Sequence, residues 1–166
     1  MPRILLILLA VFLTASCFLF FGPARNRAYK VMLGRLLSHN VPEIDIAAAV
    51  RARGAVFLDA REPDEYEVSH IEGALHVGFS HFDLQSVAHL PKDTPVIVYC
   101  TVGYRSEKIA AEMQENGFMA VSNLYGGIFE WVNGGYPVVC NGAPTERVHA
   151  FDRIWGIWLQ RGTCVY

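Results

Sequence analysis

Short apolar runs alternate with amphipathic stretches along most of this chain. Three runs have the length and apolar content of buried strands: 55–59 (AVFLD), 95–99 (PVIVY) and 121–124 (VSNL). Helices are predicted over 45–53, 64–68, 81–89, 106–116 and 128–133. Strands that alternate with helices normally form a parallel sheet with helices on both faces. The pattern therefore predicts one α/β domain from about Val41 to Val139.

Residues with special backbone or capping properties stand at the expected helix ends. Asp45 is suited to cap the first helix and Gly54 to end it. Pro63 suits the first turn of the second helix, because it needs no amide donor there. Ser80 is expected to cap the helix over 81–89.

The N-terminal part differs from the rest, because residues 4–24 contain no charged side chain. This run is long enough to span a bilayer, so residues 1–24 are interpreted as a single-pass transmembrane anchor. A cleaved signal peptide is the alternative, with Arg3 as its positive start and small residues such as Ala24 near a cleavage site. The run is longer than the apolar region of a usual signal peptide, which favours the anchor.

Residues 25–40 are interpreted as a juxtamembrane linker with a short helix over 27–38. That helix either lies near the membrane surface or packs on the domain. Four basic residues follow the apolar run: Arg25, Arg27, Lys30 and Arg35. Because basic residues favour the cytoplasmic side, we expect the C-terminal domain in the cytoplasm. The imbalance is small, and the exported orientation stays open.

Composition excludes several classes of protein. The 166 residues are 52% hydrophobic and 18% charged, which excludes a disordered chain. Fourteen Lys and Arg against 16 Asp and Glu give a net charge of −2, so we expect no nucleic-acid partner. Four cysteines are too few for a disulfide scaffold. The six histidines lack metal-ligand spacing, so no metal or cofactor is expected.

The main chemical signal follows the strand at 95–99. Cys100 directly follows that strand, and Ser106 is expected to open a helix. Backbone amides and the positive end of a helix favour a thiolate, which is a strong nucleophile. Gly103 allows a tight loop, and Arg105 adds a fixed positive charge. A buried structural thiol is the alternative, but it would need neither the glycine loop nor the arginine.

Three stretches of the chain resemble the signatures of the rhodanese (sulfurtransferase) family. Residues 56–74 (VFLDAREPDEYEVSHIEGA) are similar to its first signature. Residues 96–106 (VIVYCTVGYRS) resemble its active-site loop, and residues 123–138 (NLYGGIFEWVNGGYPV) its closing signature. The three occur in the family's order and together cover most of the predicted domain.

The resemblance implies a five-stranded, mainly parallel sheet flanked by helices. It implies that Cys100 takes a sulfane sulfur from a small donor, thiosulfate or a persulfide. The resulting persulfide would pass its sulfur to cyanide, a thiol or a protein acceptor. Arg105 would hold the loop and orient an oxyanion of the donor, while Asp59 and Arg61 would organise the surroundings of the site. The loop that would surround the outer sulfur consists of Thr101, Val102, Gly103, Tyr104, Arg105 and Ser106.

The chain departs from the family pattern at Ser69, His76 and Gly78, which are scaffold positions. Arg105 is the only cation of the loop, which argues against thiosulfate as the natural donor. One alternative is a cysteine-dependent phosphatase or arsenate reductase. Those enzymes have five residues between cysteine and arginine, whereas four separate Cys100 from Arg105. The other alternative is a membrane-tethered module that binds a partner or delivers persulfide to it.

Residues 140–166 form a C-terminal extension outside the resemblance. Its apolar stretch from Phe151 to Leu159 predicts a helix that docks on the domain. A surface that faces the membrane or a partner is the alternative, because tryptophan is frequent at interfaces. Cys140 and Cys164 are able to form a disulfide only if the domain is exported.

Overall fold

The structure is a computed structural model, and it describes residues 25–166. The anchor predicted at residues 4–24 lies outside the described residues and stays a prediction. Among residues 25–166, no helix is both long and apolar enough to cross a bilayer. Residues 25–36 are helical, close to the range 27–38 expected from sequence.

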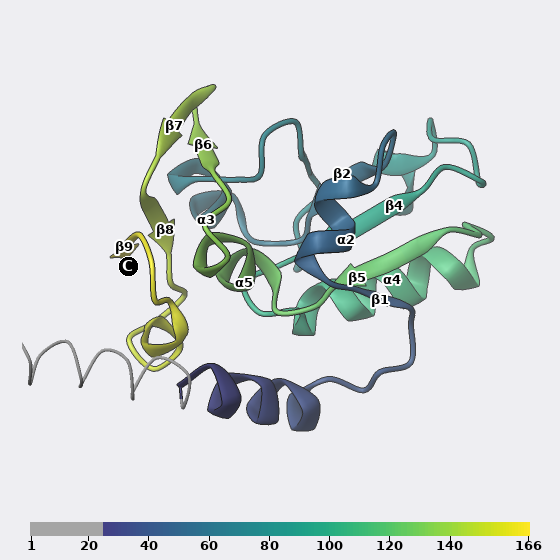
Figure 1. Cartoon of the computed structure of the whole chain (residues 1–166). Coiled ribbons are helices and arrows are strands. Elements are labelled where there is room, and N and C mark those ends of the chain that lie inside the picture. Colours follow the sequence, from purple (N-terminus) through teal and green to yellow (C-terminus); the bar gives the residue numbers. More distant parts are fainter. Residues whose placement is uncertain (1–24) are drawn as a thin grey trace, which may run out of the picture. The chain divides into compact units, whose positions relative to one another are not determined.

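Residues Leu36–Tyr166 form one compact unit built on a five-stranded parallel sheet. Every pairing within this sheet is parallel, which confirms the predicted architecture (Figure 1). Two of the five strands have only two residues, too few to give a recognisable apolar run. In spatial order the strands are β1 (Glu43–Ile44), β5 (Val121–Leu124), β4 (Val96–Tyr99), β2 (Val56–Asp59) and β3 (Leu75–His76).

Four α-helices accompany the sheet: α2 (Ile46–Arg51), α3 (Pro63–Val68), α4 (Tyr104–Glu115) and α5 (Gly127–Asn133). Asp45 caps α2 as predicted, because its carboxylate accepts from the Ala48 amide at 2.7 Å. Glu62 and Glu65 cap α3 reciprocally in a capping box. Helix α4 packs against β4 and β5, so the central strand β4 is buried along its whole length.

The helix predicted over 81–89 is wrong, because that region holds only the 3-10 helix η1 (Leu84–Val87). Asp83 caps η1 by accepting from the Gln85 amide. Ser80 does not cap a helix, since its hydroxyl donates to the Glu62 carboxylate at 2.6 Å. The Ser80 side chain, predicted to cap a helix, therefore binds a residue 18 positions earlier in the chain.

Helix α4 begins at Tyr104, two residues before the start expected from sequence. Gly103 precedes it with φ of 110°, in the left-handed region that glycine enters without strain. Ser106 is therefore not the residue that opens the helix. It is buried in the first turn of α4, where its hydroxyl donates to Asn123 Oδ1 at 2.7 Å.

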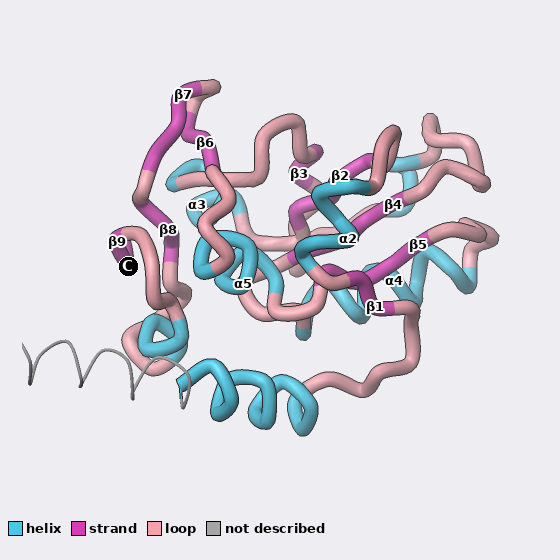
Figure 2. Tube along the Cα trace, in the orientation of Figure 1, coloured by secondary structure: helices cyan, strands magenta, loops and turns pink. Residues whose placement is uncertain are grey.

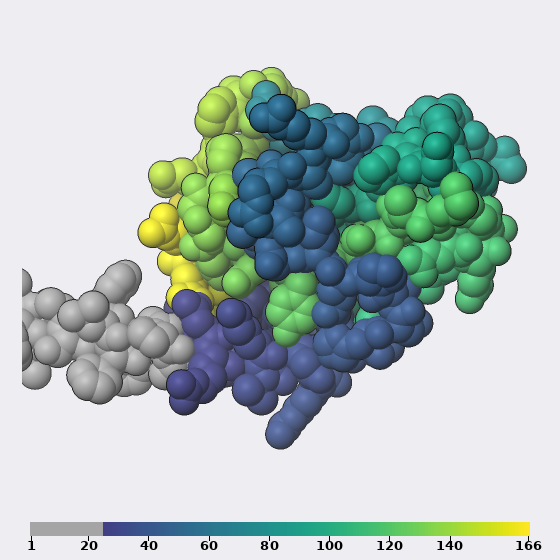
Figure 3. Space-filling model, turned by 45° about the vertical axis from the view of Figure 1, so that its right-hand side comes forward, coloured from purple at the N-terminus to yellow at the C-terminus, as the bar shows by residue number. Residues whose placement is uncertain are grey.

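The C-terminal extension folds as part of the same unit. An antiparallel hairpin of β6 (Val138–Cys140) and β7 (Ala143–Thr145) leads into β8 (Arg147–His149), which pairs in parallel with β9 (Thr163–Val165). Figure 2 shows these strands to one side of the main sheet. In Figure 3 the yellow C-terminal residues lie against the unit rather than projecting from it.

Only the 3-10 helix η2 (Trp155–Trp158) is helical in this extension, so the predicted docking helix is wrong in type. Docking itself is observed, because the Asn133 side chain donates to Trp158 O at 3.0 Å and accepts from the Gln160 amide at 2.6 Å. Cys140 and Cys164 are not joined; their thiols contact different backbone carbonyls.

Candidate active site

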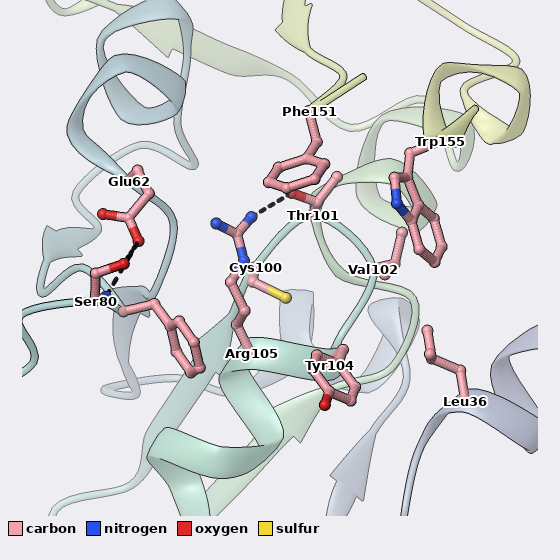
Figure 4. A pocket seen from close by; sticks show the side chains of 11 residues that line it. Leu36, Glu62, Ser80, Cys100, Thr101, Val102, Tyr104, Arg105, Phe151 and Trp155 are labelled. Atoms are coloured by element: carbon pink, nitrogen blue, oxygen red, sulfur yellow. Dashed lines mark hydrogen bonds between the residues drawn. The ribbon is translucent and has the colours of Figure 1, made fainter. Parts of the chain in front are cut away.

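Cys100 stands directly after β4 and is 1% exposed. Its Sγ accepts a hydrogen bond from the Gly103 amide at 3.2 Å. The side chain lines a cavity of about 510 Å³ at this end of the sheet (Figure 4). Reactive groups of open parallel sheets are found at the carboxyl ends of strands, and Cys100 has that position.

The first turn of α5 holds the loop from one side. The Ile128 amide donates to Cys100 O at 2.9 Å, and the Phe129 amide donates to Thr101 O at 3.2 Å. This approach requires glycine at position 127, because a Cβ there would lie 2.3 Å from Cys100 O. The first-turn amides of a helix have no partner within the helix. These two hydrogen bonds therefore satisfy both the amides of α5 and the carbonyls of the loop.

Asn123, buried in β5, holds the loop from within. Its Nδ2 donates to Gly103 O at 3.0 Å, while its Oδ1 accepts from Ser106. A trans peptide places its N–H opposite its carbonyl, so amides next to these anchored carbonyls point away from the anchors. Five backbone amides of the loop have no oxygen acceptor among residues 25–166. They are the amides of Thr101, Val102, Tyr104, Arg105 and Ser106. The loop thus surrounds Cys100 with available donors.

Arg105 does not point its guanidinium freely into the cavity. Its Nη1 donates to Glu65 Oε2 at 2.6 Å, and its Nη2 donates to Glu65 Oε1 and to Thr101 Oγ1, each at 2.8 Å. Thr101 Oγ1 in turn donates to Glu65 Oε1 at 2.9 Å. The Glu65–Arg105 ion pair ties the loop to α3, and the Glu65 carboxylate balances the charge of Arg105. The sequence analysis missed Glu65, whose signals were its place in the capping box and in the Glu-Tyr of the first motif.

The titration behaviour of this pair follows from its burial. Glu65 is 2% exposed, and burial alone would raise its pKa. The hydrogen bonds and charge of Arg105 outweigh this, so the pKa of Glu65 lies below its usual 4.5. For Arg105 burial acts to lower the pKa, but the Glu65 carboxylate raises it overall. Both side chains are therefore charged at neutral pH.

Asp59 and Arg61 form a second ion pair that is completely buried. Arg61 Nη2 donates to Asp59 Oδ2 and to Ser69 O, both at 2.6 Å. Burial acts to lower the pKa of Arg61, but the Asp59 carboxylate keeps it above its usual value. Neither residue lines the cavity around Cys100. The pair joins the end of β2 to the segment that follows α3.

The cavity around Cys100 is mainly apolar, and the C-terminal extension contributes Phe151 and Trp155 to it (Figure 4). The sequence analysis placed neither residue at the site, because 50 residues of chain separate Cys100 from the nearer of them. Glu62 and Ser80 add polar groups that are bonded to each other. Among the described residues, the lining consists of Leu36, Glu62, Phe79, Ser80, Cys100, Thr101, Val102, Tyr104, Arg105, Phe151 and Trp155.

Residues 45–134 match the model of the rhodanese-like domain. Over 101 residues the chain is 40% identical to a tRNA uridine(34) hydroxylase of Escherichia coli O139:H28, covering 55% of this chain and 29% of that relative. The chain thus spans under a third of that relative's length.

The fold is also found in solved structures. The BH2092 protein of Bacillus halodurans superposes with a TM-score of 0.55 and 26% identity, over 69% of this chain and 85% of that one. The polysulfide-sulfur transferase homodimer of Wolinella succinogenes gives a TM-score of 0.55 at 19% identity, over 73% and 93% of the respective chains. At that identity the second likeness shows the fold alone.

Replacing Gly127 with alanine should displace the loop that carries Cys100. The new Cβ would meet the Cys100 and Thr101 carbonyls, so we expect the free energy of unfolding to fall by about 1–3 kcal/mol beyond the backbone cost. Gly54→Ala is the control, because Gly54 also has a positive φ but open space around it, and it should lose only about 1–2 kcal/mol. Urea unfolding measures both losses. Equal losses would contradict the close approach.

Glu65→Gln should lower the free energy of unfolding by about 3 kcal/mol at pH 7, because it leaves the Arg105 charge without its partner. Since the pKa of Glu65 is depressed in the folded state, its stabilisation is complete above the unfolded pKa and is lost as pH falls through the folded pKa. The difference between the two proteins should therefore shrink below about pH 4.5. Unfolding by urea across pH measures it.

The matched control for this change is Glu67→Gln, on the exposed side of the same helix. It should change stability by less than about 0.5 kcal/mol at any pH. A Glu65→Gln difference that stays constant down to pH 3, or a Glu67→Gln effect of the same size, would rule out the pair as the cause.

Proposed function

The chain belongs to the rhodanese-like domain family, and from this membership we propose that it is a sulfurtransferase in which Cys100 carries the sulfur. One observation carries the proposal: Sγ of Cys100 sits at a cavity inside a loop whose carbonyls are anchored outward and whose amides remain available. Such a loop stabilises negative charge on a sulfur atom bound to the cysteine.

The reaction proceeds in two half-reactions. In the first, the Cys100 thiolate attacks the outer sulfur of a donor R–S–S⁻. A bond forms between the two sulfur atoms, and the bond within the donor breaks, so that its electron pair leaves with R–S⁻ as a thiolate. In the second, an acceptor thiolate or cyanide attacks the outer sulfur of the persulfide. The Cys100 thiolate departs unchanged, so sulfur is transferred without any other oxidant or reductant.

Several loop residues would bind the persulfide through their backbone amides. Gly103 already donates to Sγ, and the remaining amides of the loop are proposed to donate to the outer sulfur. Arg105 acts through the loop, since its guanidinium is bound to Glu65 and Thr101. This supports a positioning role for Arg105 in place of the oxyanion contact expected from sequence.

The arrangement of Arg105 also argues against the phosphatase alternative. A phosphatase needs its arginine for the phosphate oxygens, whereas both terminal nitrogens of Arg105 donate to Glu65. The match to the tRNA hydroxylase covers 29% of that relative, and we propose no hydroxylase activity from it. Delivery of persulfide to a protein acceptor remains compatible with the same Cys100 chemistry.

We propose further that residues 4–24 anchor the chain in a membrane with the domain on the cytoplasmic side. This rests on the uncharged run and on the basic residues that follow it. The full-length chain should then stay in the membrane pellet after alkaline carbonate extraction, and a Leu13→Arg, Leu19→Arg double variant should be released. Release of both proteins would contradict the anchor.

The Cys100→Ser variant tests the sulfur carrier. After incubation with a sulfane-sulfur donor, the wild-type chain should gain the mass of one sulfur atom, and a reductant should remove it. Cys100→Ser should gain none, because a serine hydroxyl does not accept the sulfur. Intact-mass spectrometry under non-reducing conditions measures the change.

Cys140→Ser is the matched control, since Cys140 is also a free thiol but lies outside the cavity. It should gain one sulfur like the wild type. If the mass gain persists in Cys100→Ser and is lost in Cys140→Ser, Cys140 carries the sulfur and the proposal is wrong.

A further inference from the structure

The cavity around Cys100 carries no excess of positive charge. Among residues 25–166, Arg105 is the only cation that lines it, and Glu65 binds that guanidinium through both carboxylate oxygens. Glu62 adds a second carboxylate at the cavity wall, where it accepts from Ser80. With one cation and two carboxylates, this environment opposes a doubly charged donor such as thiosulfate.

The walls of the cavity are apolar over most of their area. Its volume of about 510 Å³ is within the range of sites that bind organic molecules. A small inorganic anion would have to leave water and place its oxygens against hydrocarbon, which is unfavourable. The apolar and aromatic lining consists of Leu36, Phe79, Val102, Tyr104, Phe151 and Trp155.

The C-terminal extension builds one side of this wall. The Arg105 guanidinium carbon lies over the Phe151 ring, 5.4 Å from its centroid, so the ring covers a cation that would otherwise attract an anion (Figure 4). Phe151 has φ of 64°, an uncommon backbone state for a bulky residue. The amide of Trp155 donates to Asp152 Oδ1 at 2.9 Å, which fixes the start of η2 beside the cavity.

We propose that the sulfur donor is an organic sulfane-sulfur compound whose leaving group carries an aromatic or alkyl body. Phe151 and Trp155 determine this specificity by packing against that body. The inference rests on the proposed sulfurtransferase function and names the substrate class of the same site. Burial of an aromatic ring in an apolar wall supplies binding energy that thiosulfate does not obtain.

Thiosulfonates are suitable probes, because R–SO₂–S⁻ replaces one oxyanion of thiosulfate with an organic group. The Cys100 thiolate attacks the terminal sulfur, and a new sulfur–sulfur bond forms. The bond from that sulfur to the sulfonyl sulfur breaks, and its electron pair leaves with the sulfinate R–SO₂⁻. With thiosulfate the leaving group is sulfite, so the same persulfide results from every donor.

The experiment measures the second-order rate of persulfide formation on the full-length chain by intact-mass spectrometry. The donors are thiosulfate, methanethiosulfonate and benzenethiosulfonate, and each rate is divided by its rate with a small free thiol. We expect benzenethiosulfonate to exceed methanethiosulfonate by about tenfold or more, and thiosulfate to be slowest.

Substitutions in the cavity wall test which residues cause the preference for the aromatic donor. Phe151→Ala and Trp155→Ala should each reduce the benzene-to-methane ratio at least about threefold, because each removes aromatic contact. Phe151→Lys should shift the preference toward thiosulfate by adding a cation beside Arg105. Ile157→Ala is the control, since Ile157 is on η2 and 54% exposed but does not line the cavity, and it should keep the wild-type ratio.

The outcomes separate the two proposals. If no donor yields a persulfide on Cys100, the sulfurtransferase function itself is wrong. If persulfide forms but thiosulfate reacts as fast as the thiosulfonates after normalisation, the function stands and the donor class is wrong. If the aromatic preference survives in Phe151→Ala and Trp155→Ala, or Ile157→Ala abolishes it equally, the assignment of these two residues is overturned. Phe151 is 54% exposed, so its replacement should not prevent folding.

Discussion

Two hydrogen bonds from the first turn of α5 determine the shape of the loop after Cys100. They satisfy the carbonyls of Cys100 and Thr101, and each fixes the plane of the peptide it contacts. Helix α5 is able to come this close because position 127 has no side chain. The available amides next to Cys100 are a consequence of this contact between two segments far apart in sequence.

The Glu65–Arg105 pair acts on the same loop from its other side. Two buried charges are stable there because both carboxylate oxygens and both terminal nitrogens take part in hydrogen bonds. The pair makes the arginine a structural tie between α3 and the loop. It also leaves the cavity without a free cation among its described lining residues, which is the basis of the proposed donor class.

The C-terminal extension converts an open sheet end into a walled cavity. Its backbone is anchored through Asn133 at the end of α5, and it returns along β8 and β9 so that η2 lies beside the site. Phe151 and Trp155 then face a loop that is about 50 residues earlier in the chain. The same helix α5 therefore contacts the loop after Cys100 at one end and the extension that walls the cavity at the other.

Sequence patterns were sufficient where the signal is local. The apolar runs gave the three longer strands, Asp45 and Pro63 gave the start of α2 and α3, and the cysteine followed by glycine and arginine identified the loop. The family motifs implied the full sheet, although β1 and β3 are too short to be read from periodicity. The failures have a common cause, which is competition from tertiary contacts. Ser80 and Ser106 are residue types that commonly cap helices. Their hydroxyls donate instead to Glu62 and Asn123, respectively.

Local patterns in the chain were enough to predict the α/β architecture and to select Cys100 as the proposed nucleophile, because strand burial and loop chemistry are encoded within a few neighbouring residues. The tertiary structure was needed to show that Arg105 is paired with Glu65 and that Phe151 and Trp155 line the cavity. It also shows that the extension holds the short 3-10 helix η2 and the paired strands β8 and β9 in place of the predicted helix. Those contacts join segments far apart in the chain, 40 residues in the case of the ion pair, and their energies depend on distance and burial that no local pattern specifies.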